Sequence, residues 1–211
     1  MIILIISFLT SYNQPTWGID NPLPIFLNHG EVIIHIREEP IHKLRAKIGV
    51  GIWNSILIGT SFGGRNLVGY GDIDWEKQPS LDLRMRVFGN GVLESVIGYN
   101  NEPIEDYEAK GVFASIGSRL NLGSFRLLLS GGGNYSPAAS GADFFANGVL
   151  NLGGPHIFHI EYILGSNDDR VNRVNFGYKI QSGALGAQID LKDVLSGDIG
   201  RQIQIFYREN F

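Results

Sequence analysis

The chain has 211 residues, a formal net charge of −4 at pH 7 and no cysteine. Its length suffices for one large domain, and the lack of cysteine excludes a disulfide framework and a thiolate metal site. The acidic balance argues against nucleic acid as a partner. No apolar run reaches the roughly 18 residues that a helical membrane span needs. The 28 glycines are many for a strand-patterned chain and are expected where a curved sheet packs closely.

The first thirty residues carry no strand pattern. Residues 1–10 are a short apolar run that resembles the core of a secretory signal, although a positive n-region and a small-x-small cleavage site are missing. We therefore expect residues 1–12 to be the remnant of an export signal, with a buried strand as the alternative. Residues 13–30 are too rich in proline to form a regular element.

Dense alternation of apolar and polar residues begins near Glu31 and continues to the end of the chain. Segments of about ten alternating residues, separated by turns, are the sequence signature of a transmembrane barrel. Short and longer connections alternate between them, as in a meander with tight turns at one rim. We predict an all-β fold, a single antiparallel up-and-down transmembrane β-barrel of about twelve strands over residues 31–211. The expected strands are 31–38, 43–53, 55–64, 80–88, 92–99, 109–121, 124–135, 143–151, 156–164, 172–180, 183–191 and 200–210.

Each expected strand has one apolar and one polar face. In the last strand, Ile203, Ile205 and Tyr207 share one face, whereas Gln204 and Arg208 lie on the other. A soluble sandwich also alternates, and it remains the alternative fold. The polar faces here mix Gly, Ser, Asn, Gln and Arg, which suits a crowded lumen. Several apolar faces end in Tyr or Phe, which suits the aromatic girdles of a membrane barrel.

The polar faces carry more basic than acidic side chains. There are ten basic candidates against four acidic ones, which are Asp82, Glu94, Glu161 and Asp190. A basic ring inside a low-dielectric wall favours anions. Alternatively, arginines and carboxylates on neighbouring strands pair and fill the lumen, as in many small barrels. The basic candidates are Arg37 and nine residues that we predict to bind a ligand in the lumen, namely Arg45, Lys47, Arg84, Arg86, Arg119, Arg126, Arg173, Lys179 and Arg208.

Enzymatic chemistry has little support in the sequence. His156 and His159 are three residues apart, so they point to opposite faces of a strand and do not form a two-ligand metal site. A hydrolase at the rim is the enzymatic alternative, and it needs a serine beside one of the histidines. We expect no nucleophile elbow, and the Gly131–Gly133 run lacks the Gly-Lys-Ser/Thr of a phosphate loop. We predict no catalytic residue, no metal and no cofactor.

Three blocks resemble segments of a known family. They are Gly59 to Trp75, Gly132 to Ser136, and Asp190 to Leu195 followed by a strand that ends in Phe211. In this order they resemble an uncharacterised bacterial outer-membrane β-barrel family, which is similar to the barrel domain of YjbH-type exopolysaccharide-associated proteins. The resemblance implies residence in the bacterial outer membrane and contact with its lipid. It also implies that the barrel-assembly machinery reads the C-terminal strand ending in Phe211.

Two functional hypotheses follow. The first is a non-enzymatic envelope conduit or export accessory, related to polysaccharide, whose basic lumen favours small anions or an anionic saccharide. The second is a structural or binding barrel that is plugged by its own side chains and acts through the loops at residues 65–79 and 100–108.

Overall fold

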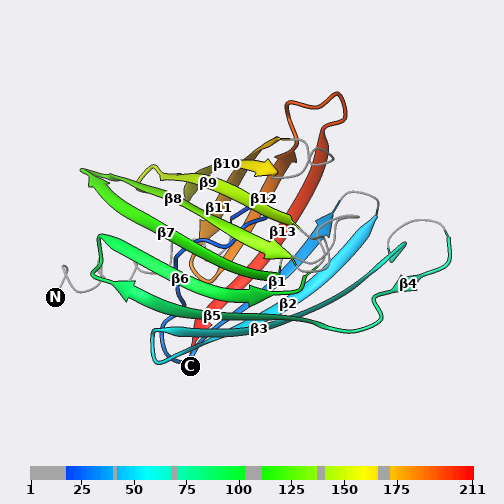
Figure 1. The fold of residues 1–211 in the computed structure, drawn as a ribbon, viewed down its shortest axis with the longest axis horizontal. Helices are drawn as coiled ribbons and strands as arrows, with labels where there is room; N and C mark the ends of the chain where they lie inside the picture. Colours follow the sequence, from blue (N-terminus) through cyan, green and yellow to red (C-terminus); the bar gives the residue numbers. More distant parts are fainter. Residues whose placement is uncertain (1–17, 40–41, 68–70, 103–110, 137–140, 166–171) are drawn as a thin grey trace.

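The computed structural model describes residues 18–39, 42–67, 71–102, 111–136, 141–165 and 172–211 (Figure 1). Among these residues, all regular structure is β-strand, and no helix is long and apolar enough to cross a membrane. The strands are β1 (Glu31–Glu39), β2 (Lys43–Ile52), β3 (Ile56–Arg65), β4 (Asp74–Trp75), β5 (Ser80–Gly89), β6 (Leu93–Asn100), β7 (Gly111–Leu122), β8 (Phe125–Ser136), β9 (Gly141–Asn151), β10 (His156–Gly165), β11 (Arg173–Ser182), β12 (Leu185–Lys192) and β13 (Gly200–Asn210).

The strands form one closed antiparallel sheet. Each long strand pairs with its neighbours in the sequence, and β1 pairs with β13, so that the sheet has no open edge. The short β4 pairs only with the end of β3 and stands outside the ring (Figure 1). The result is the twelve-strand up-and-down barrel that the alternation predicted. The predicted strand limits agree with the observed ones to within two residues, but β4 was not predicted, because it is two residues long and lies in a loop rich in Gly and Asp.

The outer face of the barrel is apolar and the inner face polar. Ile160, Ile189 and Ile205 are among the apolar side chains exposed on the outside, whereas Glu161, Asp190 and Gln204 beside them are buried inside. Hydrocarbon offers no hydrogen bonds, so only a closed sheet with an apolar exterior satisfies the backbone there. The chain is therefore a transmembrane barrel. The aromatic residues of the outer face include Phe62, Trp75, Tyr99, Tyr135, Phe144 and Tyr162 toward one rim and Phe88, Phe125 and Phe158 toward the other.

The two rims differ in the length of their connections. At the tight-turn rim, adjacent strands are joined by residues 53–55, 90–92, 123–124, 152–155 and 183–184. Gly123 and Gly183 have positive φ there, which two-residue hairpin turns require. At the long-loop rim the connections include residues 66–79, 101–110 and 193–199. The C-terminus lies at the tight-turn rim, where the Phe211 amide donates to the Gly30 carbonyl.

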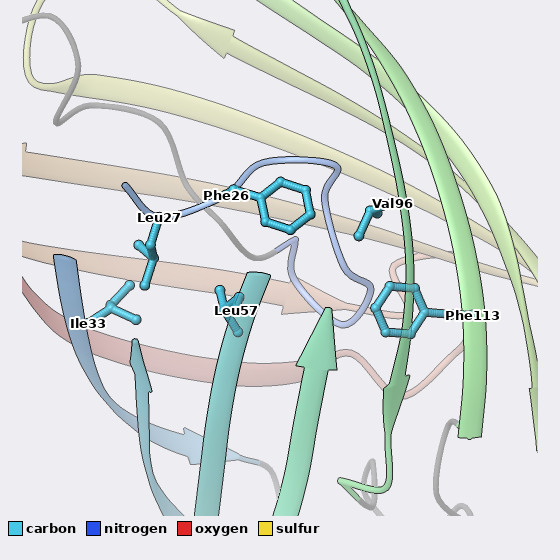
Figure 2. Packing of buried hydrophobic residues seen from close by; sticks show 6 residues of the cluster. All are labelled: Phe26, Leu27, Ile33, Leu57, Val96 and Phe113. Carbon is cyan, nitrogen blue, oxygen red and sulfur yellow. The ribbon is translucent and has the colours of Figure 1, made fainter. Parts of the chain in front are cut away.

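The chain that precedes β1 runs through the barrel. Residues 18–30, which we call the lumen segment, form an irregular stretch whose course inside the barrel is visible in Figure 1. Their apolar side chains are buried. Phe26 and Leu27 pack with side chains of β1, β3, β6 and β7 (Figure 2). Leu23 and Ile25 pack with a second apolar group on β8, β9 and β10. The sequence predicted no regular element for the lumen segment, and it did not predict that the segment lies inside the barrel. The expected signal remnant, residues 1–12, lies outside the described residues.

We expect charge on the outer face to be costly in proportion to depth. Leu129, near the middle of β8, and Leu122, at the tight-turn end of β7, both point outward. Leu129→Arg should lower the free energy of unfolding by about 2–4 kcal/mol and Leu122→Arg by at most about 1 kcal/mol, because only the first charge lies deep in hydrocarbon. Reversible denaturant unfolding in vesicles measures both values. Equal costs at the two positions would contradict a membrane-embedded outer face.

Candidate functional site

The lumen is the candidate site, and its long-loop half contains a network of ion pairs. Lys47 Nζ lies 2.8 Å from Glu102 Oε2 and 3.2 Å from Asp82 Oδ2. Arg84 Nε lies 3.1 Å from Asp82 Oδ1. Arg37 also pairs with Glu102. The remaining members of the network are Glu39, Lys43, Arg45 and Glu76.

These pairs offset much of the basic excess that the sequence predicted for the inner face. Glu31 and Glu39 lie on the inward face of β1. Glu31 was already the first residue of the predicted strand, and extending that strand by one residue would have found Glu39. Glu76 and Glu102 reach the network from loops, where strand periodicity gives no signal. Two inward-facing bases were also missed, although the alternation reaches them. Lys43 begins the predicted strand 43–53, and Lys192 directly follows the predicted strand 183–191.

Glu102 is the carboxylate on which several cations of this network converge. It follows β6, and its side chain is buried between Arg37, Arg45 and Lys47. Burial by itself raises the pKa of the Glu102 carboxyl, but Lys47, Arg37 and Arg45 together outweigh burial and hold that pKa well below its ordinary value of 4.5. Glu102 is therefore charged at neutral pH and fixes the loop end of β6 to β1 and β2.

A second polar group lines the wall formed by β11, β12, β13 and β1. Asp190 accepts hydrogen bonds from Gln188 at 2.7 Å, from Gln202 at 3.0 Å and from Gln204. Arg208 forms a two-contact ion pair with Glu31 across the β1–β13 closure. This pair joins the last strand to the first from inside the barrel.

The lumen segment is held at its N-terminal end by one buried carboxylate. The backbone N–H groups of Asp20 and Asn21 donate to Glu161 at 3.1 and 2.9 Å. Asn175 Nδ2 bridges the Glu161 and Asp20 carboxylates, and Lys192 Nζ lies 3.1 Å from Asp20 Oδ1. These contacts attach the segment to β10, β11 and β12, and we call them the Glu161 anchor.

Glycines on the wall make room for the rest of the segment. A Cβ at Gly117 would lie 2.7 Å from Pro24 Cγ, and one at Gly51 would lie 2.1 Å from the Asn28 carbonyl oxygen. Only glycine lets the segment lie this close to β7 and β2. The shape of the inner wall and the course of the lumen segment are therefore matched.

The nine predicted lumen-binding residues fall into two groups, although the structure does not test whether they bind a ligand. Five are buried and lie on β2, β5, β11 and β13, namely Arg45, Lys47, Arg84, Lys179 and Arg208. Four are half-buried, and three of these lie together on β5, β7 and β8 toward the tight-turn rim, namely Arg86, Arg119 and Arg126, whereas Arg173 begins β11 at the opposite rim.

The prediction that the chain has no G-x-S-x-G motif, the sequence pattern of a nucleophile elbow, was wrong. Gly59 to Gly63 has the G-x-S-x-G order, with Ser61 at its centre. These residues lie within β3, however, and not at the strand-to-helix turn that an elbow requires. Ser61 is buried, and its Oγ accepts a hydrogen bond from Arg45 Nη1 at 3.2 Å.

The histidines do not complete a hydrolytic site among the described residues. His156 Nδ1 lies 2.7 Å from the Tyr178 hydroxyl, and His35 and His159 are buried in the lumen. No hydrogen bond joins a histidine to a serine in the part of the chain that the structure describes. Within the same ranges, no three His, Asp or Glu side chains are placed to hold a metal ion.

A pocket of about 460 Å³ lies at the long-loop rim. It is lined by polar and charged side chains of the segment after β4, together with one residue that follows β6, namely Glu76, Lys77, Gln78, Ser80 and Asn101. All of these residues except Ser80 belong to the two loops predicted to contact a partner, 65–79 and 100–108, although residues 68–70 and 103–108 of those loops lie outside the described ranges.

Comparison with known proteins supports the fold. No family model matches the chain, and no curated protein matches it. The chain is similar to a solved structure of the KdgM porin in complex with disordered oligogalacturonate, with a TM-score of 0.56 and 9% identity, covering 86% of this chain and 99% of that one. A second KdgM porin structure has a TM-score of 0.51 and 10% identity over the same shares. Wzi, a carbohydrate-binding outer-membrane β-barrel involved in group 1 capsule assembly in Escherichia coli, has a TM-score of 0.37 and 9% identity, covering 80% of this chain and 52% of that one, which is too low to carry an argument. With identities this low, the two KdgM comparisons show a shared fold alone, that of a porin-like outer-membrane barrel.

Removal of the Glu102 charge should destabilise the barrel and change its response to acid. Glu102→Gln should cost about 3 kcal/mol near neutral pH, because it leaves buried cations with less compensation. Since the pKa of Glu102 is lower in the folded state, its contribution is present above about pH 4.5 and is lost as the pH falls through the lowered value. The gap between wild type and variant should therefore narrow as unfolding is measured from about pH 6 to about pH 3.

The exposed Glu209 at the end of β13 offers a matched control. Glu209→Gln should change stability by less than about 0.5 kcal/mol at any of these pH values. A constant gap between Glu102→Gln and wild type across the range would show that the Glu102 charge has no special environment.

Proposed function

We propose that the protein is a non-enzymatic outer-membrane barrel that binds or conducts saccharides, and that the lumen segment closes it at rest. The observation that carries the proposal is that a separate segment of the chain, and not the wall of the barrel, occupies the lumen. Residues 18–30 cross a lumen lined by amide and charged side chains and are held by the Glu161 anchor. The wall itself is complete without them, because each long strand is hydrogen-bonded to both neighbours.

A saccharide is the ligand class best supported by the lining and by the shared fold. Asn, Gln, Arg and Glu side chains supply the donors and acceptors that sugar hydroxyls require. The KdgM porin, whose fold the chain shares, is described in complex with oligogalacturonate. The similarity predicted from the sequence to YjbH-type exopolysaccharide-associated barrels belongs to the same hypothesis, in which the protein serves polysaccharide export or uptake.

The orientation follows from the unequal rims. Outer-membrane barrels have short turns on the periplasmic side and longer loops outside the cell. We infer that the tight-turn rim faces the periplasm and that the pocket lined by Glu76 to Ser80 faces outward. The C-terminal strand, whose Phe211 side chain is 87% exposed, is then available to the barrel-assembly machinery.

A second candidate function is a permanently plugged barrel that binds a partner through the long-loop rim. The specific observation in its favour is the network in which Lys47, Arg84 and Glu102 are all buried and paired, since such pairs fill the long-loop half of the lumen. The two candidates differ in one measurable property, which is whether release of the lumen segment opens a path for ions.

We expect Glu161→Ala to open the channel. The variant removes the acceptor for two backbone N–H groups, and hydrogen bonds to a charged group contribute about 1.5–3 kcal/mol each. The open population in planar bilayers should rise about tenfold or more over wild type, and hydrogen exchange of residues 18–27 should accelerate. Glu161→Gln, which keeps an acceptor without the charge, should give an intermediate value.

Glu209→Ala is the control, because Glu209 is exposed and does not contact the lumen segment. All variants should first be shown to be folded by their heat-modifiable mobility in gels. Barrels that stay sealed in Glu161→Ala, although residues 18–27 exchange faster, would reject the conduit and leave the plugged binding barrel.

A further inference from the structure

Two half-buried arginines share one carboxylate near the tight-turn rim. Arg86 of β5 and Arg119 of β7 both face the lumen, on either side of Glu94 of β6. Arg119 Nη2 lies 3.0 Å from Glu94 Oε1, and Arg86 Nη2 lies 3.6 Å from Glu94 Oε2. Each guanidinium carries five N–H donors, so Glu94 uses only part of what the two arginines offer.

These arginines differ from the rest of the lumen in their access to water. The side chains of Arg86 and Arg119 are 29% and 26% exposed, whereas those of Arg45 and Arg84 are 1% and 0% exposed. The buried arginines have carboxylate partners within the ion-pair network. An incoming anion can therefore reach Arg86 and Arg119 but not the cations of the long-loop half.

The neighbourhood adds positive charge and no further acid on the adjoining turns. The connections of β5 to β10 at this rim read Asn-Gly-Val, Gly-Ser and Leu-Gly-Gly-Pro, without a carboxylate. Arg126 begins the inward face of β8 on the adjacent strand. The Arg86 guanidinium also lies 4.8 Å from the centre of the Phe26 ring, which orients it.

We propose that Arg86 and Arg119, supported by Arg126, form an oxyanion-binding site at the tight-turn mouth of the barrel, and that its ligand is a carboxylate-bearing saccharide. Guanidinium groups bind planar carboxylates through paired hydrogen bonds. The saccharide part of this assignment rests on the proposed function; the new element is the location of the binding site at the tight-turn mouth, with Glu94 competing for its two arginines. Because Phe26 belongs to the lumen segment, the ligand would lie beside the end of that segment.

Binding to the folded full-length protein in detergent tests the proposal directly. Calorimetry should show that trigalacturonate binds and that maltotriose, a neutral trisaccharide, does not, with an affinity that falls as salt is raised. Arg86→Gln and Arg119→Gln should each weaken binding about tenfold, since each removes a charge-assisted contact. Glu94→Gln should strengthen it roughly threefold or more by removing the competing carboxylate.

The gain expected for Glu94→Gln keeps the test independent of misfolding, because a damaged barrel does not bind more tightly. Arg201→Gln, an exposed arginine on the outer face of β13, is the matched control and should leave binding unchanged. Unchanged affinity in both arginine variants, or a weaker Glu94→Gln, would overturn the site. Inorganic phosphate binding as tightly as trigalacturonate would overturn the saccharide assignment.

This outcome is separable from that of the conduit. The binding measurement does not depend on ion flow. If Glu161→Ala stays sealed but the affinities of the variants follow the prediction, the binding site is supported and the conduit is rejected. If Glu161→Ala opens the barrel but all variants bind trigalacturonate equally, the conduit is supported and the binding site is rejected.

Discussion

Closure of the sheet on itself is the constraint on which the rest of the structure depends. In hydrocarbon each strand must satisfy its backbone on both sides, and pairing of β1 with β13 is what removes the last open edge. Once the apolar faces are committed to lipid, every polar face must point into one narrow lumen. The buried charges are a consequence of this closure, and a charge in such a place is tolerated only with a partner.

The partners come from two sources. Residues of the wall supply some of them, as Asp82 does for Arg84 within β5 and Glu31 of β1 does for Arg208 of β13. Other partners are brought by chain that is not part of the wall, since Glu102 arrives from a loop. The lumen segment adds apolar side chains, which need no partner, and one of the two apolar clusters that they form with the wall is shown in Figure 2. The interior therefore combines an ion-pair network with apolar clusters.

The strands were predictable because apolar and polar residues alternate along a barrel strand with a period of two. A register shift of one residue would place the polar side chains on the lipid-facing side. This is why the inward positions of Arg45, Arg84 and Lys179 could be assigned from the sequence. The ion-pair partners could not be assigned, because strand closure and loop conformation decide that Glu102 meets Arg37, 65 residues earlier. The lumen segment was missed for the same reason, since nothing local to Asp20 shows that its backbone will meet a carboxylate 141 residues away.

The way in which the lumen is closed also bears on whether it can open. A lumen filled by wall side chains opens only by breaking many buried pairs at once, whereas a segment can leave as a unit while the wall keeps its hydrogen bonds. Here the polar contacts at the N-terminal end of the segment are concentrated on Glu161 and the residues that contact it, and the middle of the segment packs through apolar side chains. The C-terminal end, at His29 and Gly30, is hydrogen-bonded to the end of β2 and the turn that follows it. The proposed gate requires two discrete states that differ by a few interactions, and release of the anchored part of the segment would supply the second of them. Of the accessible arginines, Arg86 lies beside Phe26, away from the Glu161 anchor, so the ligand proposed at the mouth and the anchor would contact the same segment at two places.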